Sequence, residues 1–265
     1  MPDPSIELFH EAWYRDHRAD FEGDALEHFS RSGWREGSDP HPLFDVRYYL
    51  AQLGHALPDG VDPLHHFISV GAREGMNPHP LFDTVFYMSR YADSLGGLDP
   101  LTHYLRKGAA LKYDPHPLFN TDYYLTSNPD VEESGINPLF HYVTIGGTDT
   151  RRQPHPLFDA MMYAQRRRLP KGINPLVDFV VRLEEARKLK PDEQPHCSIV
   201  ILNLNKSLMT LQCVVDALDS QDGHELEVIV VDNGSRPEEF AWRRDVVGTI
   251  EWPATRDGKV LYARP

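Results

Sequence analysis

Apolar and polar positions return in a fixed order along the first two thirds of the chain. A first anchor reads His-Pro-Leu-Phe followed by Asp or Asn, and a second anchor of Asp or Asn, Pro and Leu follows some 20 residues later. The first anchor begins at His41, His79, His116 and His155. The second begins at Asp62, Asp99, Asn137 and Asn174. An aromatic pair follows the first anchor, and a His-aromatic pair and then a glycine follow most copies of the second. Such a period is typical of a stacked repeat array.

The pattern predicts five helical repeats. Leu8-Phe9-His10 opens a degenerate first copy, and in the last copy Asp178 stands where the second histidine of the others stands. The expected repeats are 8–40, 41–78, 79–115, 116–154 and 155–190.

Each repeat is expected to hold two short helices. The acid or amide that ends each first anchor stands where an N-cap side chain accepts from unpaired backbone N–H groups. In the second anchor, Asp62 can cap while Pro63 takes the first helical position. Gly71, Gly108 and Gly146 then stand where a left-handed residue would end the helix. Helices this short need neighbours, so Leu-Phe and Tyr-Tyr side chains are expected to pack between repeats.

The recurring histidines have two interpretations. A metal site needs several of them to converge on one point. The interpretation we favour is structural, with a ring nitrogen bonded to a backbone carbonyl of the adjoining repeat.

After residue 190 the pattern changes. Residues 177–190 predict a longer helix, and 191–196 a linker. The run Cys197–Asn203 suits a buried parallel strand. Apolar residues then recur at helical spacing over 207–220, a second buried strand covers 226–231, and a further helix is expected near Arg236. The fold class is therefore α + α/β: a helical array followed by a β-α-β unit with parallel strands.

Two polar turns follow the two strands: Asn203-Leu204-Asn205, and Asp232-Asn233-Gly234-Ser235. In parallel sheets, ligands bind beyond the carboxyl ends of the strands. An aspartate there can accept from a ribose or a base, which predicts a nucleotide-type ligand. The alternative is that Asp232 caps the next helix. There is no glycine-rich phosphate loop, which disfavours dinucleotide enzymes and P-loop kinases.

The segments Ser198–Asn205 and Glu227–Ser235 resemble the opening of inverting family-2 glycosyltransferases with the GT-A, Rossmann-like fold. The resemblance covers about 70 residues, from Cys197 to Pro265. It implies transfer of a sugar from a nucleotide-diphosphate donor to a glycan or lipid-linked acceptor, as in bacterial polysaccharide biosynthesis. It also implies that residues 203–205 line the nucleotide pocket and that Asp232 contacts the base or ribose.

The resemblance further implies a divalent metal, Mg²⁺ or Mn²⁺, held by an Asp-x-Asp motif beyond the second strand. No such motif stands in this sequence, where Asp257 is the late acid and has no partner aspartate. We therefore expect a truncated chain with no catalytic residue or metal site of its own and no transferase activity alone.

The amino-acid composition limits the classes of partner that the protein is expected to bind. The net charge of −13 argues against nucleic acid. No signal peptide, membrane-spanning run or disulfide framework is evident, so we expect a cytoplasmic protein, either free or peripheral to the inner membrane. Residues 151–190 hold ten Lys or Arg against four Asp or Glu, including Arg166-Arg167-Arg168. This stretch is either a solvated helix face or a patch that meets phosphate on a sugar donor or a lipid surface.

Two function classes remain: a sugar transferase whose repeats position an acceptor, and a non-catalytic repeat scaffold that binds a protein, a glycan or a membrane surface.

Overall fold

A computed structural model describes residues 8–18, 20–188, 197–219, 226–232, 235–236, 254–255 and 258–263. The chain divides into two units. Unit 1 is Met1–Pro156 with Ala160–Pro175, and unit 2 is Leu157–Asp159 with Leu176–Pro265. Each unit is described by itself. The predicted linker, 191–196, lies outside the described residues.

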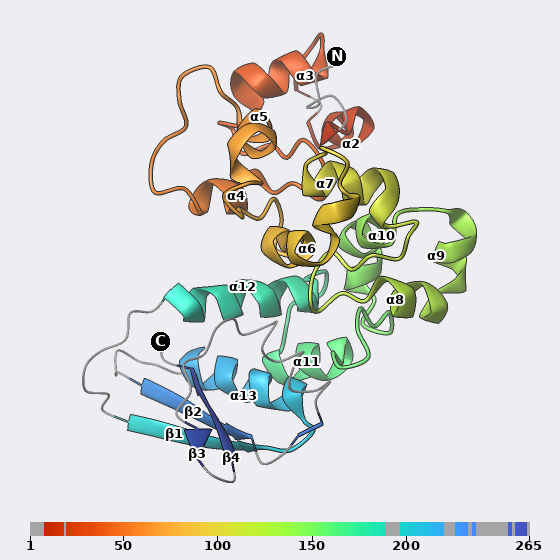
Figure 1. Ribbon diagram of the computed structural model, residues 1–265. Helices are drawn as coiled ribbons and strands as arrows, with labels where there is room; N and C mark the ends of the chain where they lie inside the picture. Colours follow the sequence, from red (N-terminus) through yellow and green to blue (C-terminus); the bar gives the residue numbers. More distant parts are fainter. Residues whose placement is uncertain are drawn as a thin grey trace. The chain divides into compact units, whose positions relative to one another are not determined.

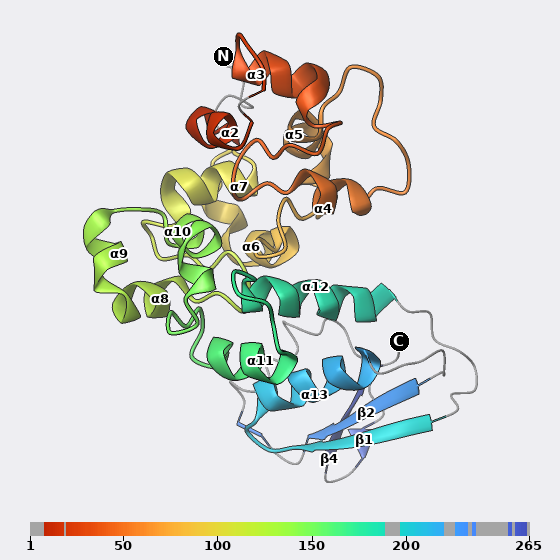
Figure 2. The ribbon, with the colours of Figure 1, turned by 180° about the vertical axis from the view of Figure 1, so that it is seen from behind.

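Unit 1 is helical, and its helices are short (Figures 1 and 2). The α-helices are α2 Glu11–His17, α3 Ala25–His28, α4 Val46–Ala51, α5 Pro63–His66, α6 Thr84–Tyr91, α7 Pro100–His103, α8 Thr121–Ser127, α9 Pro129–Ser134, α10 Pro138–Thr144 and α11 Ala160–Arg167. Two helices follow the two anchors of each repeat in unit 1, and the fourth repeat adds α9 between them. This arrangement is compatible with the predicted repeats.

The second helix of a repeat is not the regular helix that the pattern predicted. In the first three repeats its α-helical turn continues into a five-residue π-helical turn that ends at the recurring glycine. These turns are η1 Phe29–Gly33, η2 Phe67–Gly71 and η4 Tyr104–Gly108. Two 3₁₀ turns, η3 Ala92–Ser94 and η5 Gly146–Thr148, extend α6 and α10. A single extra residue per turn is not readable from the apolar spacing of so short a segment.

The predicted N-caps are present, and a second cap accompanies the first. The Asp83 carboxylate accepts from the backbone N–H of Phe86 at 2.8 Å. Two residues before His79, at the end of the preceding repeat, the Asn77 side chain accepts from the N–H of Thr84 at 2.9 Å. The equivalent double caps are Asp45 with Asp39, and Asn120 with Asp114. Two of the unpaired N–H groups at each helix start are thereby satisfied.

A backbone hydrogen bond joins the beginning of each of the first four predicted repeats to the last residue of the same repeat. The N–H of the capping residue donates to the carbonyl of the proline that precedes the next first anchor. The bonds are His10 to Pro40 at 2.8 Å, Asp45 to Pro78 at 2.9 Å, Asp83 to Pro115 at 2.9 Å and Asn120 to Pro154 at 3.0 Å. The bond pairs two backbone groups and ties the end of each of these repeats back to the start of its first helix.

The first-anchor histidine closes its own turn. The His79 Nδ1 accepts from the N–H of Leu81 at 3.0 Å, and His79 O accepts from the N–H of Phe82 at 2.9 Å. His41 and His116 do the same in their repeats. An Nδ1 that accepts from a backbone N–H belongs to a neutral ring. The expected bond to a carbonyl of the adjoining repeat is therefore wrong for this nitrogen, since its partner lies two residues away.

The second-anchor histidine pairs with a tyrosine of its own repeat. The pairs are Tyr14–His28, Tyr49–His66, Tyr87–His103 and Tyr124–His141, with Oη–Nδ1 distances of 2.7, 2.7, 2.8 and 2.9 Å. All four tyrosines are fully buried. The histidine partner is again not a carbonyl of the neighbouring repeat.

The recurring glycines are not left-handed. Gly33, Gly71, Gly108 and Gly146 are absent from the residues with positive φ. A Cβ at each of them would instead collide with the hydroxyl of the paired tyrosine. The predicted left-handed cap is therefore wrong, and close approach of the tyrosine is what requires glycine.

Most ring contacts of the aromatic core lie within one repeat, and the rings of His10, His41 and Phe140, from three repeats, also meet at centroid distances of 5.8, 5.6 and 5.9 Å. Phe82 meets Tyr87 and Tyr104 of its own repeat at centroid distances of 5.3 and 5.8 Å. Of each aromatic pair, the second ring is buried and the first is half-buried, as Tyr48 and Tyr49 illustrate. Packing of both tyrosines between repeats, as predicted, is not what these contacts describe.

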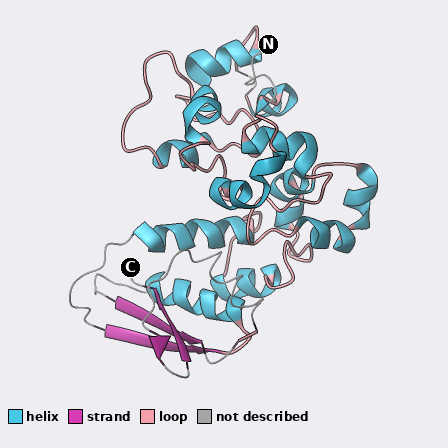
Figure 3. Cartoon of the chain, viewed as in Figure 1, coloured by secondary structure: helices cyan, strands magenta, loops and turns pink. Residues whose placement is uncertain are grey.

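Unit 2 holds the strands, drawn in magenta in Figure 3. Its elements are α12 Pro175–Lys188, β1 Cys197–Asn203, α13 Ser207–Asp219, β2 Leu226–Asp232, β3 Ala254–Thr255 and β4 Gly258–Ala263. The sheet order is β1-β2-β4-β3. Strands β1 and β2 run parallel, whereas β4 runs antiparallel to β2 and to β3. Neither β3 nor β4 was predicted, and the helix expected near Arg236 lies mostly outside the described residues.

Helix α13 lies along one face of the sheet (Figure 1). Its Val214 packs with Val228 and Val230 of β2 in a small buried cluster. On β1, however, Val200 is 58% exposed and Leu202 is 75% exposed. The expectation of a fully buried first strand is therefore wrong within the described residues, because α13 covers only one of its faces.

Candidate functional site

The two predicted polar turns begin at the same edge of the sheet. Asn203, the last residue of β1, is the register partner of Asp232, the last residue of β2. Both strands run in the same direction, so their carboxyl ends lie side by side. The side chain of Asp232, together with Asn233 and Gly234, lies outside what the structure describes.

The hydroxyl of Ser235 joins the two turns. Its Oγ accepts from the Asn203 amide Nδ2 at 2.8 Å and from the backbone N–H of Asn205 at 2.9 Å. In return, the Asn205 side-chain Oδ1 accepts from the N–H of Arg236 at 2.8 Å. The alternative in which Asp232 caps the next helix falls on residues beyond the described ones, and the bonds of Ser235 run to the other turn.

Asn205 occupies a conformation that few residues adopt. Its φ is 51°, in the left-handed region that Asn tolerates better than most residues with a Cβ. This conformation lets one residue both donate to Ser235 and accept from Arg236. Asn205 is half-buried, and Leu204 is 53% exposed. These two residues are the accessible part of the first turn.

Asn203 lies beneath the surface, at 2% exposure. Its Nδ2 donates to Ser235, and its Oδ1 accepts from the Thr210 hydroxyl at 2.6 Å. Both ends of the amide are thus engaged inside the unit, which makes Asn203 a support of the site rather than a contact for a ligand. Sequence reasoning missed Thr210, whose only signal is a hydroxyl in the first turn of the helix after β1.

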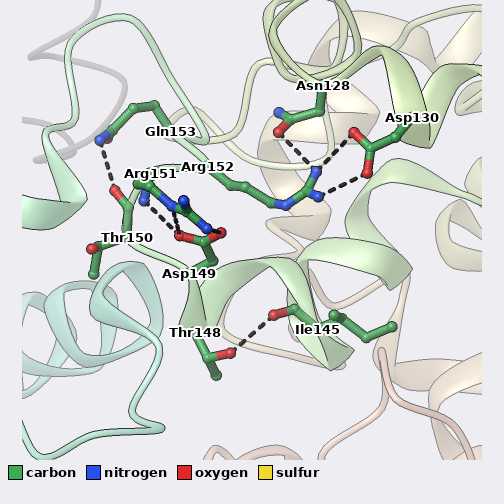
Figure 4. Close-up of polar contacts among 9 residues, drawn as sticks. All are labelled: Asn128, Asp130, Ile145, Thr148, Asp149, Thr150, Arg151, Arg152 and Gln153. Atoms are coloured by element: carbon green, nitrogen blue, oxygen red, sulfur yellow. Dashed lines mark hydrogen bonds and ion pairs between the residues drawn. The ribbon is translucent and has the colours of Figure 1, made fainter.

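The basic stretch 151–190 is partly neutralised (Figure 4). Arg152 pairs with the carboxylate of Asp130 at 2.7 Å, and one of its nitrogens also donates to the Asn128 side chain at 2.9 Å. Arg151 pairs with Asp149 at 2.8 Å. In unit 2, Arg182 pairs with Asp178 at 2.9 Å. These pairs favour the solvated-face interpretation at three of the ten basic positions.

Among the described residues, no group of three His, Cys, Asp or Glu side chains is arranged to hold a metal ion. The divalent metal implied by the resemblance is therefore not assigned to any described residue. The histidines that prompted the metal alternative are held by the turn and tyrosine contacts given above.

Comparisons with known proteins return no match. No protein-family profile matches the sequence, and neither a curated protein nor a solved structure is detectably similar. The site and its function rest on the residues themselves.

Proposed function

We propose that unit 2 binds the nucleotide of a nucleotide-diphosphate sugar and belongs to a GT-A-type glycosyltransferase, whose parent enzyme passes the sugar to a glycan or lipid-linked acceptor. The observation that carries the proposal is the junction at Ser235. A single hydroxyl accepts from both polar turns, at the carboxyl ends of two parallel neighbouring strands.

Position and chemistry both support this reading. Ligands of parallel α/β sheets bind outside the carboxyl ends of the strands, and the residues there are amides, a hydroxyl and a strand-terminal aspartate. Such groups match ribose hydroxyls and base edges better than they match an apolar ligand. In this proposal Asn205 and Asp232 contact the nucleotide, and Asn203 and Ser235 hold the two turns together. The resemblance of residues 198–205 and 227–235 to family-2 glycosyltransferases favours this class among the enzymes that bind nucleotides.

The repeats serve, in this proposal, as an interaction or acceptor-positioning module. Their partner is a protein, a glycan or an anionic membrane surface, and the protein works in the cytoplasm, at or near the inner membrane. No helix within the described ranges is long and apolar enough to span a bilayer. In this proposal the basic stretch 151–190, which includes Arg166-Arg167-Arg168, meets the phosphate of the sugar donor or of a lipid surface.

Calorimetric titration tests the nucleotide site directly. Residues 1–265 are titrated with UDP, GDP, dTDP and CDP, and one of them is expected to bind. Asp232→Asn should weaken that binding roughly ten- to a hundredfold, because a charge-assisted hydrogen bond contributes about 1.5–3 kcal/mol.

Asp216→Asn, on the same unit near the end of α13, is the matched control and should leave the affinity unchanged. Equal affinity of the Asp232→Asn variant and the parent chain would return Asp232 to the helix-capping alternative. Absence of binding by every nucleotide would favour the second function class, a repeat scaffold, for which the regular side-chain caps between successive repeats, such as Asn77 on Thr84, are the supporting observation.

A further inference from the structure

Thr210 occupies the first turn of α13 and is 4% exposed. Its backbone N–H donates within the turn to Lys206 O at 3.0 Å, so its hydroxyl is not needed to complete the helix. That hydroxyl donates to Asn203 Oδ1 at 2.6 Å. A side chain seven residues further along the chain thereby reaches back to the end of β1.

The bond helps to orient the Asn203 amide. The two ends of an amide have nearly the same shape, so its hydrogen-bond partners together determine its orientation. With Oδ1 held by Thr210, Nδ2 points to Ser235 and donates to its Oγ. If the amide turned over, its oxygen would face Ser235 instead, and the serine hydroxyl would have to donate where it now accepts.

The arrangement of the second turn depends on the same orientation of the Asn203 amide. Ser235 Oγ also accepts from the N–H of Asn205, and the N–H of Arg236 donates back to Asn205. Four hydrogen bonds thus run in sequence from α13 through the end of β1 to both polar turns. Thr210 is the one member of this chain that lies on a helix and outside the turns.

We propose that Thr210 is a positioning residue of the nucleotide site: its hydroxyl orients the Asn203 amide and so holds residues 203–205 and 235–236 in the arrangement that receives the nucleotide. This inference rests on the proposed function. Thr210 itself does not touch the nucleotide.

The test compares three variants of residues 1–265. Thr210→Val removes the hydroxyl and keeps the volume, and Thr210→Ser keeps the hydroxyl. Val214→Ala weakens the packing of the same helix against β2 without touching either turn. For each variant we would measure the Kd for the nucleotide that binds the parent chain, the melting temperature, and amide hydrogen exchange at Asn205 and Arg236 by NMR.

Thr210→Val should weaken nucleotide binding about tenfold, as loss of one buried hydrogen bond predicts, and should speed exchange at Asn205 and Arg236. Thr210→Ser should stay within about threefold of the parent chain in both readouts. Val214→Ala should lower the melting temperature and leave Kd unchanged. Should Thr210→Val fail to fold, Thr210→Ala provides a second chain without the hydroxyl.

Two results would overturn the positioning role. The first is unchanged hydrogen exchange and unchanged affinity in Thr210→Val. The second is a loss of affinity in both Thr210→Val and Val214→Ala that is proportional to the drop in melting temperature of each. Absence of nucleotide binding by the parent chain would instead overturn the proposed function. The exchange rates would then still show whether Thr210 holds the two turns.

Discussion

The hydroxyl of Tyr49 lies against Gly71, in the space that a side chain at position 71 would occupy. A Cβ built on Gly71 would collide with Tyr49 Oη, and Tyr49 Cζ would lie only 3.1 Å from it. The same hydroxyl hydrogen-bonds to His66 Nδ1 at 2.7 Å. Glycine, tyrosine and histidine therefore form one contact, which recurs in four repeats.

Gly71→Ala should lower the free energy of unfolding by about 2–3 kcal/mol, the upper part of the range for overpacking a core. Tyr49 is fully buried and cannot retreat without leaving His66 unpaired. Urea unfolding of residues 1–265 measures the change.

Two further variants test whether the loss of stability comes from the contact between position 71 and Tyr49. Gly54→Ala should change stability by less than about 0.5 kcal/mol, because a Cβ there meets nothing within 4 Å. Adding Tyr49→Phe to Gly71→Ala should recover part of the loss, since the ring carbon remains close after the oxygen is gone. A Gly71→Ala chain as stable as the parent would show that the tyrosine does not require glycine.

The double N-cap should contribute more to the free energy of unfolding than a single cap does. Asp83→Ala and Asn77→Ala should each cost about 1 kcal/mol, with a range of about 0.5–2 kcal/mol for loss of a capping side chain. The two act on different N–H groups of α6, those of Phe86 and Thr84. Asp59→Ala, an exposed loop acid, is the control. If Asn77→Ala matches the control in thermal unfolding, the second cap contributes nothing.

Phe82→Ala should cost roughly 3–5 kcal/mol, the usual loss for a buried aromatic side chain. Phe82 is fully buried against Tyr87 and Tyr104. Phe86→Ala, at the half-buried first position of the aromatic pair, should cost clearly less. Equal unfolding midpoints for the two variants would contradict the packing described here.

Acid should unfold the array well before it protonates most carboxylates. Burial lowers the pKa of His41 to about 3 and the pKa values of His79 and His155 to about 4. Because these pKa values are depressed in the folded state, the rings contribute stability above their unfolded pKa, near 6.5. Each then loses about 1.4 kcal/mol per pH unit as the pH falls from there toward its folded value.

Asp39 acts in the opposite sense. Burial raises the pKa of its carboxyl to about 6, so its ionisation costs stability above that pH and its protonation offsets part of the histidine loss between pH 6 and 4. The net prediction is a free energy of unfolding that drops steeply from pH 6.5 to 4. Urea midpoints at pH 7.5, 6 and 5 measure this drop. The slope of the free energy of unfolding against pH gives the number of protons taken up on unfolding, and His79→Gln should lower that number by about one. Identical midpoints at pH 7.5 and 5 would rule the prediction out.

The sequence predicted what depends on near neighbours. An N-cap and the N–H groups that it accepts from lie within three residues, so Asp45, Asp62 and Asp83 could be assigned from their place before an apolar run. The places of the two polar turns of unit 2 follow from similarly local patterns, and the repeat boundaries stay a prediction. The assignment of unit 2 to a glycosyltransferase fold stays a prediction, because it rests on two short segments.

What the sequence missed depends on residues that are far apart in the chain. Gly71 was assigned to a left-handed cap because a glycine after a helix usually is one, whereas the tyrosine that excludes a side chain there lies 22 positions earlier. The exposed face of β1 could not be foreseen either, since an apolar strand does not show how many of its faces a helix will cover. Thr210 looks like any other helical threonine until the fold places it against Asn203.

The sequence by itself therefore determined where helices begin, how often the pattern repeats, and which polar residues follow the strands, because each of these is decided within one or two turns of chain. Only the tertiary structure decided why the glycines must be glycines, which partners the histidines take, and how Ser235 joins the two turns. Those features are contacts between residues that are far apart in the sequence, and only the packing of the folded chain brings them together.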